Sequence, residues 1–268
     1  MGIRISQVDA FTNRKFAGNP AAVCVLSEPA DESWMQNVAA EMNLSETAFA
    51  RRKGDGPNYN LRWFTPRKEV DLCGHATLAT AHILWEEGHL PAGEPAQFET
   101  RSGLLTAQCG PDGIELDFPS EPVREAVTDA GKLTELRSAL GTSVEFAGRN
   151  RFDLLVELET EELVRQLRPD IRAFEQFPVR GVIVTSRSNS RGCDFVSRFF
   201  APRVGVDEDP VCGSAHCCLG PYWAEKLGRP TLIAHQVSCR GGVVRVRVAG
   251  PRVVLIGHAV TVLRGELV

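Results

Sequence analysis

The sequence lacks the features that mark membrane, nucleic-acid-binding and zinc-binding proteins. No apolar run is long enough to span a bilayer, and Lys and Arg are scattered in a chain whose net charge is −4, with no basic stripe. No C-x-x-C pair occurs among the eight cysteines, which argues against a zinc ribbon or finger. The N-terminal residues also lack the apolar core of a signal peptide. We therefore expect a cytoplasmic protein that binds no membrane, no nucleic acid and no metal.

The composition is that of an ordinary globular protein. The chain has 268 residues, of which 43% are hydrophobic and 24% charged, and this length suffices for two modest domains. A disulfide framework is not needed in a chain of this size. Free cysteine is usually buried as a small hydrophobic residue. We expect this for Cys24, Cys109, Cys193 and Cys239.

One stretch of the sequence occurs twice, about half a chain length apart. Residues 62–76 and residues 198–216 share Arg, Phe, Pro, Arg, Val and Asp in the same order, followed in both copies by Cys-Gly. The second copy carries three extra residues before its Cys. Each copy reads as a strand that ends near its Pro, a short polar loop, and a helix that begins after Cys-Gly. The repeat predicts two similar halves.

The two Cys-Gly turns are the predicted sites of chemistry. A helix start offers unpaired N–H groups and a partial positive charge, and Gly74 and Gly213 would let a carboxylate approach those amides. The same field is expected to favour thiolates at Cys73 and Cys212. A small dicarboxylate or an amino-acid-like anion would suit such a site. In the second helix, Pro221 should also release the carbonyl of the residue four positions earlier.

Strands outnumber helices in the predicted architecture. Alternating and β-branched segments at both ends of the chain indicate strands, whereas the two helices after Cys-Gly are apolar on much of their circumference. We therefore predict an α+β protein in which each half is a curled, mostly antiparallel sheet around one central helix. The predicted halves are residues 1–118 and 119–268, and the last strand may cross back to the first half.

Five motifs, in order along the chain, resemble the PhzF-like family of phenazine biosynthesis, within the diaminopimelate epimerase fold superfamily. They are FAGNPAAV (16–23), NLSETAF (43–49), DLCGHAT (71–77), EDPVCGSAH (208–216) and RGG (240–242). The resemblance implies an isomerase with two similar domains, an active site between them, no cofactor, and a homodimer.

The resemblance also implies roles for individual residues. Glu46 would be the catalytic acid–base group, and His75, Asp209 and Ser214 fall on positions that contact the substrate or handle protons. The residues expected to bind a small carboxylate substrate are Ser45, Gly74, Gly213 and Ser214. Taken from the residues alone, Glu46 could instead be a solvated charge at a strand end, His75 a helix cap, and Asp209 a turn residue before Pro210.

One departure from the family pattern leaves two alternatives open. The pattern usually has Thr where this chain has Cys212, and related epimerases and racemases place a Cys there, opposite a Cys at the position of Cys73. The first alternative is therefore an amino-acid racemase or epimerase in which one thiolate takes the α-proton and the other thiol returns one. The second alternative is a non-catalytic protein that binds small anions. A fold alone does not decide among these functions.

Overall fold

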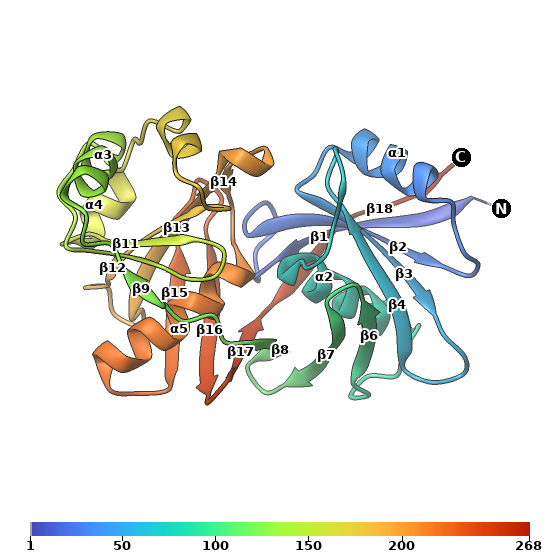
Figure 1. Ribbon diagram of the computed structural model, residues 1–268. Coiled ribbons are helices and arrows are strands. Elements are labelled where there is room, and N and C mark those ends of the chain that lie inside the picture. The colour runs from blue at the N-terminus through green and yellow to red at the C-terminus, as the bar shows by residue number, and fades with distance from the viewer. Residues whose placement is uncertain (1) are drawn as a thin grey trace. The chain divides into compact units, whose positions relative to one another are not determined.

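The computed structural model describes residues 2–268 of the chain, which divide into two compact units (Figure 1). Unit 1 comprises the residues up to Phe118 together with Val254–Val268, and unit 2 comprises Pro119–Val253. The chain therefore builds most of unit 1, then all of unit 2, and returns to unit 1 with its last strand. No helix within residues 2–268 has both the length and the apolar character needed to cross a bilayer.

Unit 1 is a set of strands with two helices. Several of the strands come from the alternating and β-branched segments near the two ends of the chain, and a turn at residues 53–57 separates two others. The elements are β1 (Ile3–Ala10), β2 (Asn19–Leu26), α1 (Glu32–Met42), β3 (Glu46–Arg52), β4 (Asn58–Phe64), β5 (Glu69–Val70), α2 (Gly74–Glu86), β6 (Ala96–Thr100), β7 (Gly103–Gly110), β8 (Gly113–Pro119) and β18 (Ala259–Leu267), with the end of β17 (Arg252–Gly257).

The sheet of unit 1 mixes parallel and antiparallel pairs. β1 pairs antiparallel with both β18 and β2, β2 pairs parallel with β3, and β3 pairs antiparallel with β4. β4 pairs parallel with β6, and β6, β7 and β8 continue as an antiparallel run that reaches β17. Since β17 leads directly into β18, the strands of unit 1 form a nearly closed sheet.

Helix α2 lies inside this curled sheet (Figure 1). It contacts β1, β2, β3, β7 and β18, and its buried residues cover nearly its whole circumference, as expected of a helix enclosed by a sheet. Its N-cap is Cys73 and its first residue is Gly74, where the repeat predicts the helix start. The fold thus places the first Cys-Gly turn at one end of the core of unit 1.

Helix α1 covers the outer face of the same strands. Its N-cap, Asp31, accepts hydrogen bonds from the backbone N–H groups of Ser33 and Trp34. The Trp34 ring meets the Phe49 ring edge to face at 5.8 Å, within a cluster formed by α1 and the outward-facing residues of β1 to β4. Unit 1 therefore has a core on each side of its sheet.

Unit 2 contains the remaining elements. It begins after β8, where the sequence predicts the boundary between halves, and its longest helix follows the second Cys-Gly turn. The elements are β9 (Glu125–Ala126), α3 (Ala130–Leu140), β10 (Phe146–Arg149), β11 (Leu154–Glu157), α4 (Glu161–Gln166), η1 (Arg172–Gln176), β12 (Val182–Arg187), β13 (Phe195–Ala201), η2 (Pro202–Val204), β14 (Val206–Asp209), α5 (Gly213–Leu227), β15 (Thr231–Gln236) and β16 (Gly242–Ala249), with the start of β17.

Strand pairing in unit 2 follows the same sequence of directions as in unit 1. β10 pairs antiparallel with β11, β11 parallel with β12, β12 antiparallel with β13, β13 parallel with β15, and β15 antiparallel with β16. This is the order of β1, β2, β3, β4, β6 and β7. Helix α5 contacts β15 and β16 and follows β13 as α2 follows β4.

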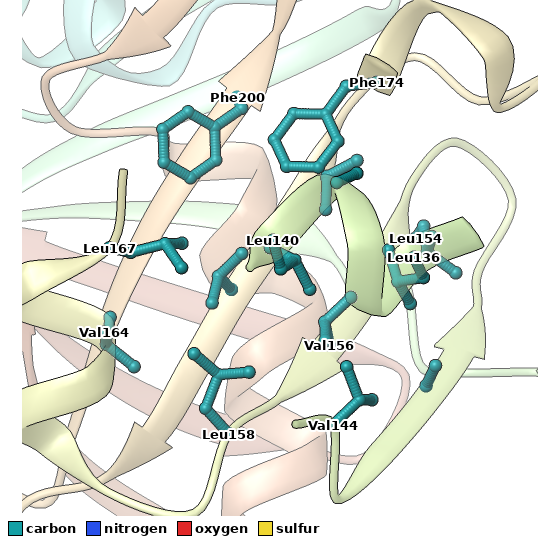
Figure 2. Close-up of a cluster of buried hydrophobic side chains, with 14 of the residues drawn as sticks. Leu136, Leu140, Val144, Leu154, Val156, Leu158, Val164, Leu167, Phe174 and Phe200 are labelled. Atoms are coloured by element: carbon teal, nitrogen blue, oxygen red, sulfur yellow. The ribbon is translucent and has the colours of Figure 1, made fainter. Parts of the chain in front are cut away.

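A hydrophobic core of unit 2 lies between its strands and the segment that carries α3, α4 and η1 (Figure 2). The rings of Phe174 and Phe200 are 5.5 Å apart at its edge, and Leu140 and Val156 are buried at its centre. Each such side chain contributes about 1.5–3 kcal/mol when fully buried. This core fixes β11, β12 and β13, the strands that support the site residues of unit 2.

The proline inside α5 has the predicted effect on hydrogen bonding. Pro221 cannot donate to the carbonyl of Cys217, and that carbonyl instead accepts a hydrogen bond of 3.0 Å from the backbone N–H of Glu121. The helix is therefore tied to the segment that opens unit 2.

The burial expected for four cysteines is wrong for two of them. Cys24 and Cys193 are buried, but Cys109 and Cys239 are exposed. Cys109 lies at the end of β7, next to the turn into β8, and Cys239 lies in the turn between β15 and β16. Neither position has another layer of structure over it, so the general tendency of cysteine to be buried does not apply.

Candidate active site

A carboxyl–imidazole pair lies at the start of α2. Glu46 is the first residue of β3 and is paired in parallel register with Ala21 of β2, while His75 is the second residue of α2. The Nε2 atom of His75 is 3.1 Å from Oε2 of Glu46, and the two side chains are 5% and 16% exposed. The contact is an ion pair only when His75 is protonated, and neither atom has a hydrogen-bond partner among residues 2–268. Both atoms can therefore still bond to a third group.

The opposite edge of the His75 ring, which carries Nδ1, contacts residues of β2 and of the first Cys-Gly turn. Nδ1 of His75 lies 3.1 Å from Nδ2 of Asn19 and 3.6 Å from Sγ of Cys73. The Ser45 hydroxyl donates to Oδ1 of Asn19 at 3.2 Å, which orients the amide so that its nitrogen faces the ring. Ser45, predicted to bind substrate, thus acts within unit 1 on Asn19. An amide that donates to Nδ1 favours the neutral imidazole with its proton on Nε2.

Asn19 is a site residue that the sequence reasoning missed, although it lies within the quoted Gly-Asn-Pro motif. Gly18 before it has a φ of +65°, and a Cβ there would lie 2.2 Å from the carbonyl oxygen of Ala10. Only glycine fits this backbone and this approach. The tight turn brings Asn19, completely buried, to the start of β2 beside His75. In the sequence, the signal for Asn19 was its place as a polar residue between a glycine and an apolar strand.

The predicted preference for a thiolate at Cys73 is wrong. Burial, together with the charge of Glu46, raises the pKa of Cys73 to about 11 despite its place at a helix start. Burial also disfavours the imidazolium form of His75, but the charges of Cys73 and Glu46 outweigh burial and raise the pKa of His75. Since Cys73 is a neutral thiol at neutral pH, Glu46 is the partner that acts on His75 there. The pair is equipped to share a proton.

Glu46, Cys73 and His75 are also residue types that ligate metals. One ligand atom from each lies within 4.8 Å of the others, and within the part of the chain that the structure describes these three form the single such group. The sequence predicts no metal for this protein, and the same three residue types can also handle protons.

The second Cys-Gly turn forms a separate cluster in unit 2. Cys212 is the N-cap of α5, Gly213 its first residue and Ser214 its second. The Cys212 Sγ and Ser214 Oγ atoms are 3.3 Å apart. Gln236, a buried residue of β15, accepts from the backbone N–H of Cys212 at 2.9 Å and donates to the backbone oxygen of Asp209 at 2.6 Å. Gln236 thereby fixes both ends of the loop that carries the predicted residues.

Arg180 completes this cluster and was not predicted. Its Nη2 atom donates to the Ser214 hydroxyl at 2.8 Å, and its Nε and Nη2 atoms donate to the buried carboxylate of Asp153 at 2.9 and 2.5 Å. The signal in the sequence was an Arg inside an otherwise apolar segment that leads into β12. Its side chain is 34% exposed.

The thiolate expectation also fails for Cys212. Burial and the charge of Asp209 raise the pKa of Cys212 well above its ordinary value, although Arg180 and the Ser214 hydroxyl act in the opposite direction. Both thiols of the predicted pair are therefore held in the neutral form. His216 is buried completely, and burial lowers its pKa to about 4.

Comparison with known proteins places this geometry in a family. The phenazine biosynthesis-like protein family matches residues 8–265 of the chain. An isomerase of Halalkalibacterium halodurans that is named as uncharacterized is 57% identical over 97% of this chain and 96% of its own length. A crystal structure of a PhzF-family phenazine biosynthesis protein from Enterococcus faecalis covers both chains completely, with 44% identity and a TM-score of 0.94.

A more distant structural neighbour extends the fold comparison. A hydroxyproline epimerase from Agrobacterium vitis, solved with bound trans-4-OH-L-proline, has 12% identity and a TM-score of 0.65 over 99% of this chain and 92% of its own. The epimerase-type α+β fold predicted from the sequence is confirmed, and so is the enzyme class, an isomerase. The chain belongs to the phenazine biosynthesis-like (PhzF) family.

Proposed function

We propose that this isomerase moves a proton on a small carboxylate-bearing substrate without a cofactor, with Glu46 as the acid–base group. The observation that carries the proposal is the 3.1 Å contact between Oε2 of Glu46 and Nε2 of His75, both buried and both without a hydrogen-bond partner among the described residues. Buried polar groups are normally satisfied, so two adjacent unsatisfied ones suggest that a substrate supplies the missing partner.

The chemistry requires one group that removes a proton and returns it at another carbon. The Glu46 carboxylate would take a proton from a carbon made acidic by a neighbouring carboxylate or conjugated double bond. The electron pair of that C–H bond would shift through the conjugated system, and the Glu46 carboxyl would then return the proton at the far carbon. No electrons are gained or lost, and no leaving group departs. Positioned acid–base groups of this kind contribute roughly 10²–10⁴ in rate.

The remaining predicted residues have supporting parts in the proposal. His75 lies next to Glu46 and would stabilise its carboxylate or exchange a proton with it. Asp209 would be a second proton-handling residue, as the family resemblance implies. The helix starts at Gly74 and at Gly213 with Ser214 are each suited to a carboxylate. The homodimer and the cytoplasmic location stay predictions.

Proton exchange with solvent tests the proposal even while the substrate is unidentified. The enzyme is incubated in D₂O with a panel of amino acids and cyclic unsaturated acids, and deuterium uptake is read by mass spectrometry. Glu46→Gln, which keeps the shape of the side chain, should lower exchange at least about a hundredfold. Glu41→Gln removes an exposed carboxylate from α1 of the same unit and should leave exchange unchanged. Activity within about tenfold of wild type in Glu46→Gln would remove Glu46 from the mechanism.

The same experiment separates the two alternatives. A two-thiol racemase would exchange the α-proton of a free amino acid and lose this exchange in Cys212→Ala. The raised pKa values of Cys73 and Cys212 oppose that chemistry, since it needs one thiolate. A non-catalytic anion-binding protein would be stabilised by a member of the panel that is recovered without deuterium.

A further inference from the structure

The guanidinium of Arg180 is fixed on one side and open on the other. Asp153, 1% exposed, accepts from both Nε and Nη2, and the second N–H of Nη2 goes to the Ser214 hydroxyl. The group also lies over the rings of Phe152 and Phe199, at 5.4 and 5.5 Å. Its Nη1 atom makes no hydrogen bond to any residue in the range 2–268, and the side chain is 34% exposed. Two N–H donors are therefore held in place without a protein acceptor.

Arg198, in the same unit, shows what a purely structural arginine looks like in this fold. Its Nε and Nη2 atoms donate to Glu208, and its Nη1 atom donates to the backbone oxygens of Val164 and Leu167. Its side chain is only 9% exposed, and every nitrogen has an acceptor. Arg180 shares the paired carboxylate but lacks the acceptors at Nη1, so support of the fold does not account for its whole geometry.

The surroundings of Arg180 favour a small anion. The Ser214 hydroxyl accepts from Arg180 and lies 3.3 Å from Sγ of Cys212, so its own proton can turn either to that sulfur or to an anion. Ser214 also lies in the first turn of α5, where backbone N–H groups lack intrahelical acceptors. Asp153 offsets the charge of Arg180, and the charge of Asp209 also acts on the guanidinium. An anion beside Arg180 would therefore be held by directed hydrogen bonds more than by an excess of positive charge. A singly charged carboxylate suits this setting better than a dianion.

We propose that Arg180 is a recognition residue for a small carboxylate, which binds the two N–H groups of Nη1 and the hydroxyl of Ser214 within unit 2. Asp153 and the two aromatic rings hold the guanidinium in its binding orientation before the anion arrives, so little side-chain entropy is lost on binding. The inference rests on the proposed function only for the class of ligand, a small molecule that carries a carboxylate.

Binding of a matched pair of probes tests the proposal directly. 4-Fluorobenzoate and 4-fluorobenzamide have nearly the same shape and differ in the charge of one group, and ¹⁹F line broadening reports binding of each to the full-length enzyme. Wild type should bind the benzoate and not the benzamide. Failure of the benzoate to bind wild type, or equal binding of both probes, overturns the proposal.

Variants at three positions locate the binding. Arg180→Met would leave the buried Asp153 carboxylate unpaired, so it is combined with Asp153→Asn. Both this double variant and Arg180→Lys, which keeps the charge but loses the planar donors, should bind 4-fluorobenzoate at least about tenfold more weakly. Arg172→Met removes an exposed arginine of η1 and should bind as wild type does. Wild-type affinity in folded Arg180→Lys and in the double variant would overturn the assignment.

The readout also separates this proposal from the proposed function. Glu46→Gln should retain benzoate binding because the proposed anion site is built from Arg180, Asp153 and Ser214, all residues of unit 2. If Glu46→Gln also retained deuterium exchange, the isomerase mechanism would fail while the anion site stood. If Glu46→Gln lost exchange and the Arg180 variants kept benzoate affinity, the mechanism would stand and the anion site would fail.

Discussion

The Nδ1 atom of His75 lies 3.1 Å from Nδ2 of Asn19, a completely buried residue at the start of β2. This contact holds the imidazole ring so that its other nitrogen faces Glu46. The side chain that orients His75 therefore comes from a turn whose backbone only glycine can form at Gly18. The proposed catalytic geometry in unit 1 depends on Asn19, which does not titrate, as well as on Glu46 and His75.

We predict that Asn19→Asp shifts the pH dependence of deuterium exchange. A carboxylate beside Nδ1 stabilises the imidazolium form, so the pKa of His75 rises further and the limb of the profile that reports His75 moves to higher pH, by about one unit. The exchange rate is measured at about five pH values between roughly 5 and 10, on a variant whose fold is checked by circular dichroism. Asn13→Asp, an exposed change in the preceding loop, serves as control. An unchanged profile in folded Asn19→Asp would contradict this role.

We predict that alkylation distinguishes the cysteines by position. Cys109 and Cys239 are exposed and should react first with iodoacetamide at neutral pH, whereas burial and raised pKa values keep Cys73 and Cys212 unreactive. Peptide mass spectrometry over time gives the order, and a sample in urea shows that all the thiols can react. Rapid labelling of native Cys73 or Cys212 would revive the two-thiol mechanism.

We predict that Glu161 makes unit 2 more stable at neutral than at acid pH. This residue, 3% exposed, accepts from the Ser188 and Ser190 hydroxyls, the Asn189 N–H and Arg165. Burial alone would raise its pKa, but these bonds outweigh burial and lower the pKa to about 2. Because the folded-state pKa lies below the unfolded one, the contribution is complete above the unfolded value, near 4.3, and is lost as the pH falls toward about 2.

The corresponding variant is Glu161→Gln. It should lower the free energy of unfolding by about 1–3 kcal/mol at pH 7, as expected for hydrogen bonds to a charged group. Urea denaturation at several pH values should show the difference from wild type shrinking as the pH falls. Glu162→Gln, the exposed neighbour on α4, should have no such effect. A constant difference across this pH range would show that the charge of Glu161 is not what stabilises the loop.

We predict that the isomerase needs no metal, although Glu46, Cys73 and His75 could bind one. Dialysis against EDTA should leave deuterium exchange unchanged. Added Zn²⁺ should inhibit exchange, because a cation bound by these residues would occupy the Glu46 carboxylate and the His75 nitrogen. Loss of exchange after EDTA that is restored by a divalent ion would contradict a proton-only mechanism.

The sequence predicts well those features that depend on local backbone requirements. The helix start after Cys73 and the hydrogen-bonding consequence of Pro221 each follow from one residue and its immediate neighbours. The enclosed position of α2 follows from its apolar circumference. The grouping of Glu46 with His75 came from the family resemblance, because the parallel pairing of β2 and β3 that supports it joins residues distant in sequence.

Features that depend on burial depth could not be predicted in the same way. The helix start at Cys73 suggested a thiolate, but the cost of burying a charge outweighs the helix field, and only the packed structure gives that burial. Arg180 stood in an apolar segment without a motif, and its role depends on Asp153 and Ser214, which come from other elements. Long-range contacts of this kind decide what a polar residue does.

The pairing of β1 with β18 has a consequence for synthesis of the protein on the ribosome. Unit 2 is contained in one continuous stretch and can fold as soon as that stretch has emerged. Unit 1 must wait for β18, so its first strands and the apolar helix α2 stay incompletely covered while most of the polypeptide is made. The residues of β1, although made before unit 2, therefore reach their native contacts with β18 only after unit 2 has been made.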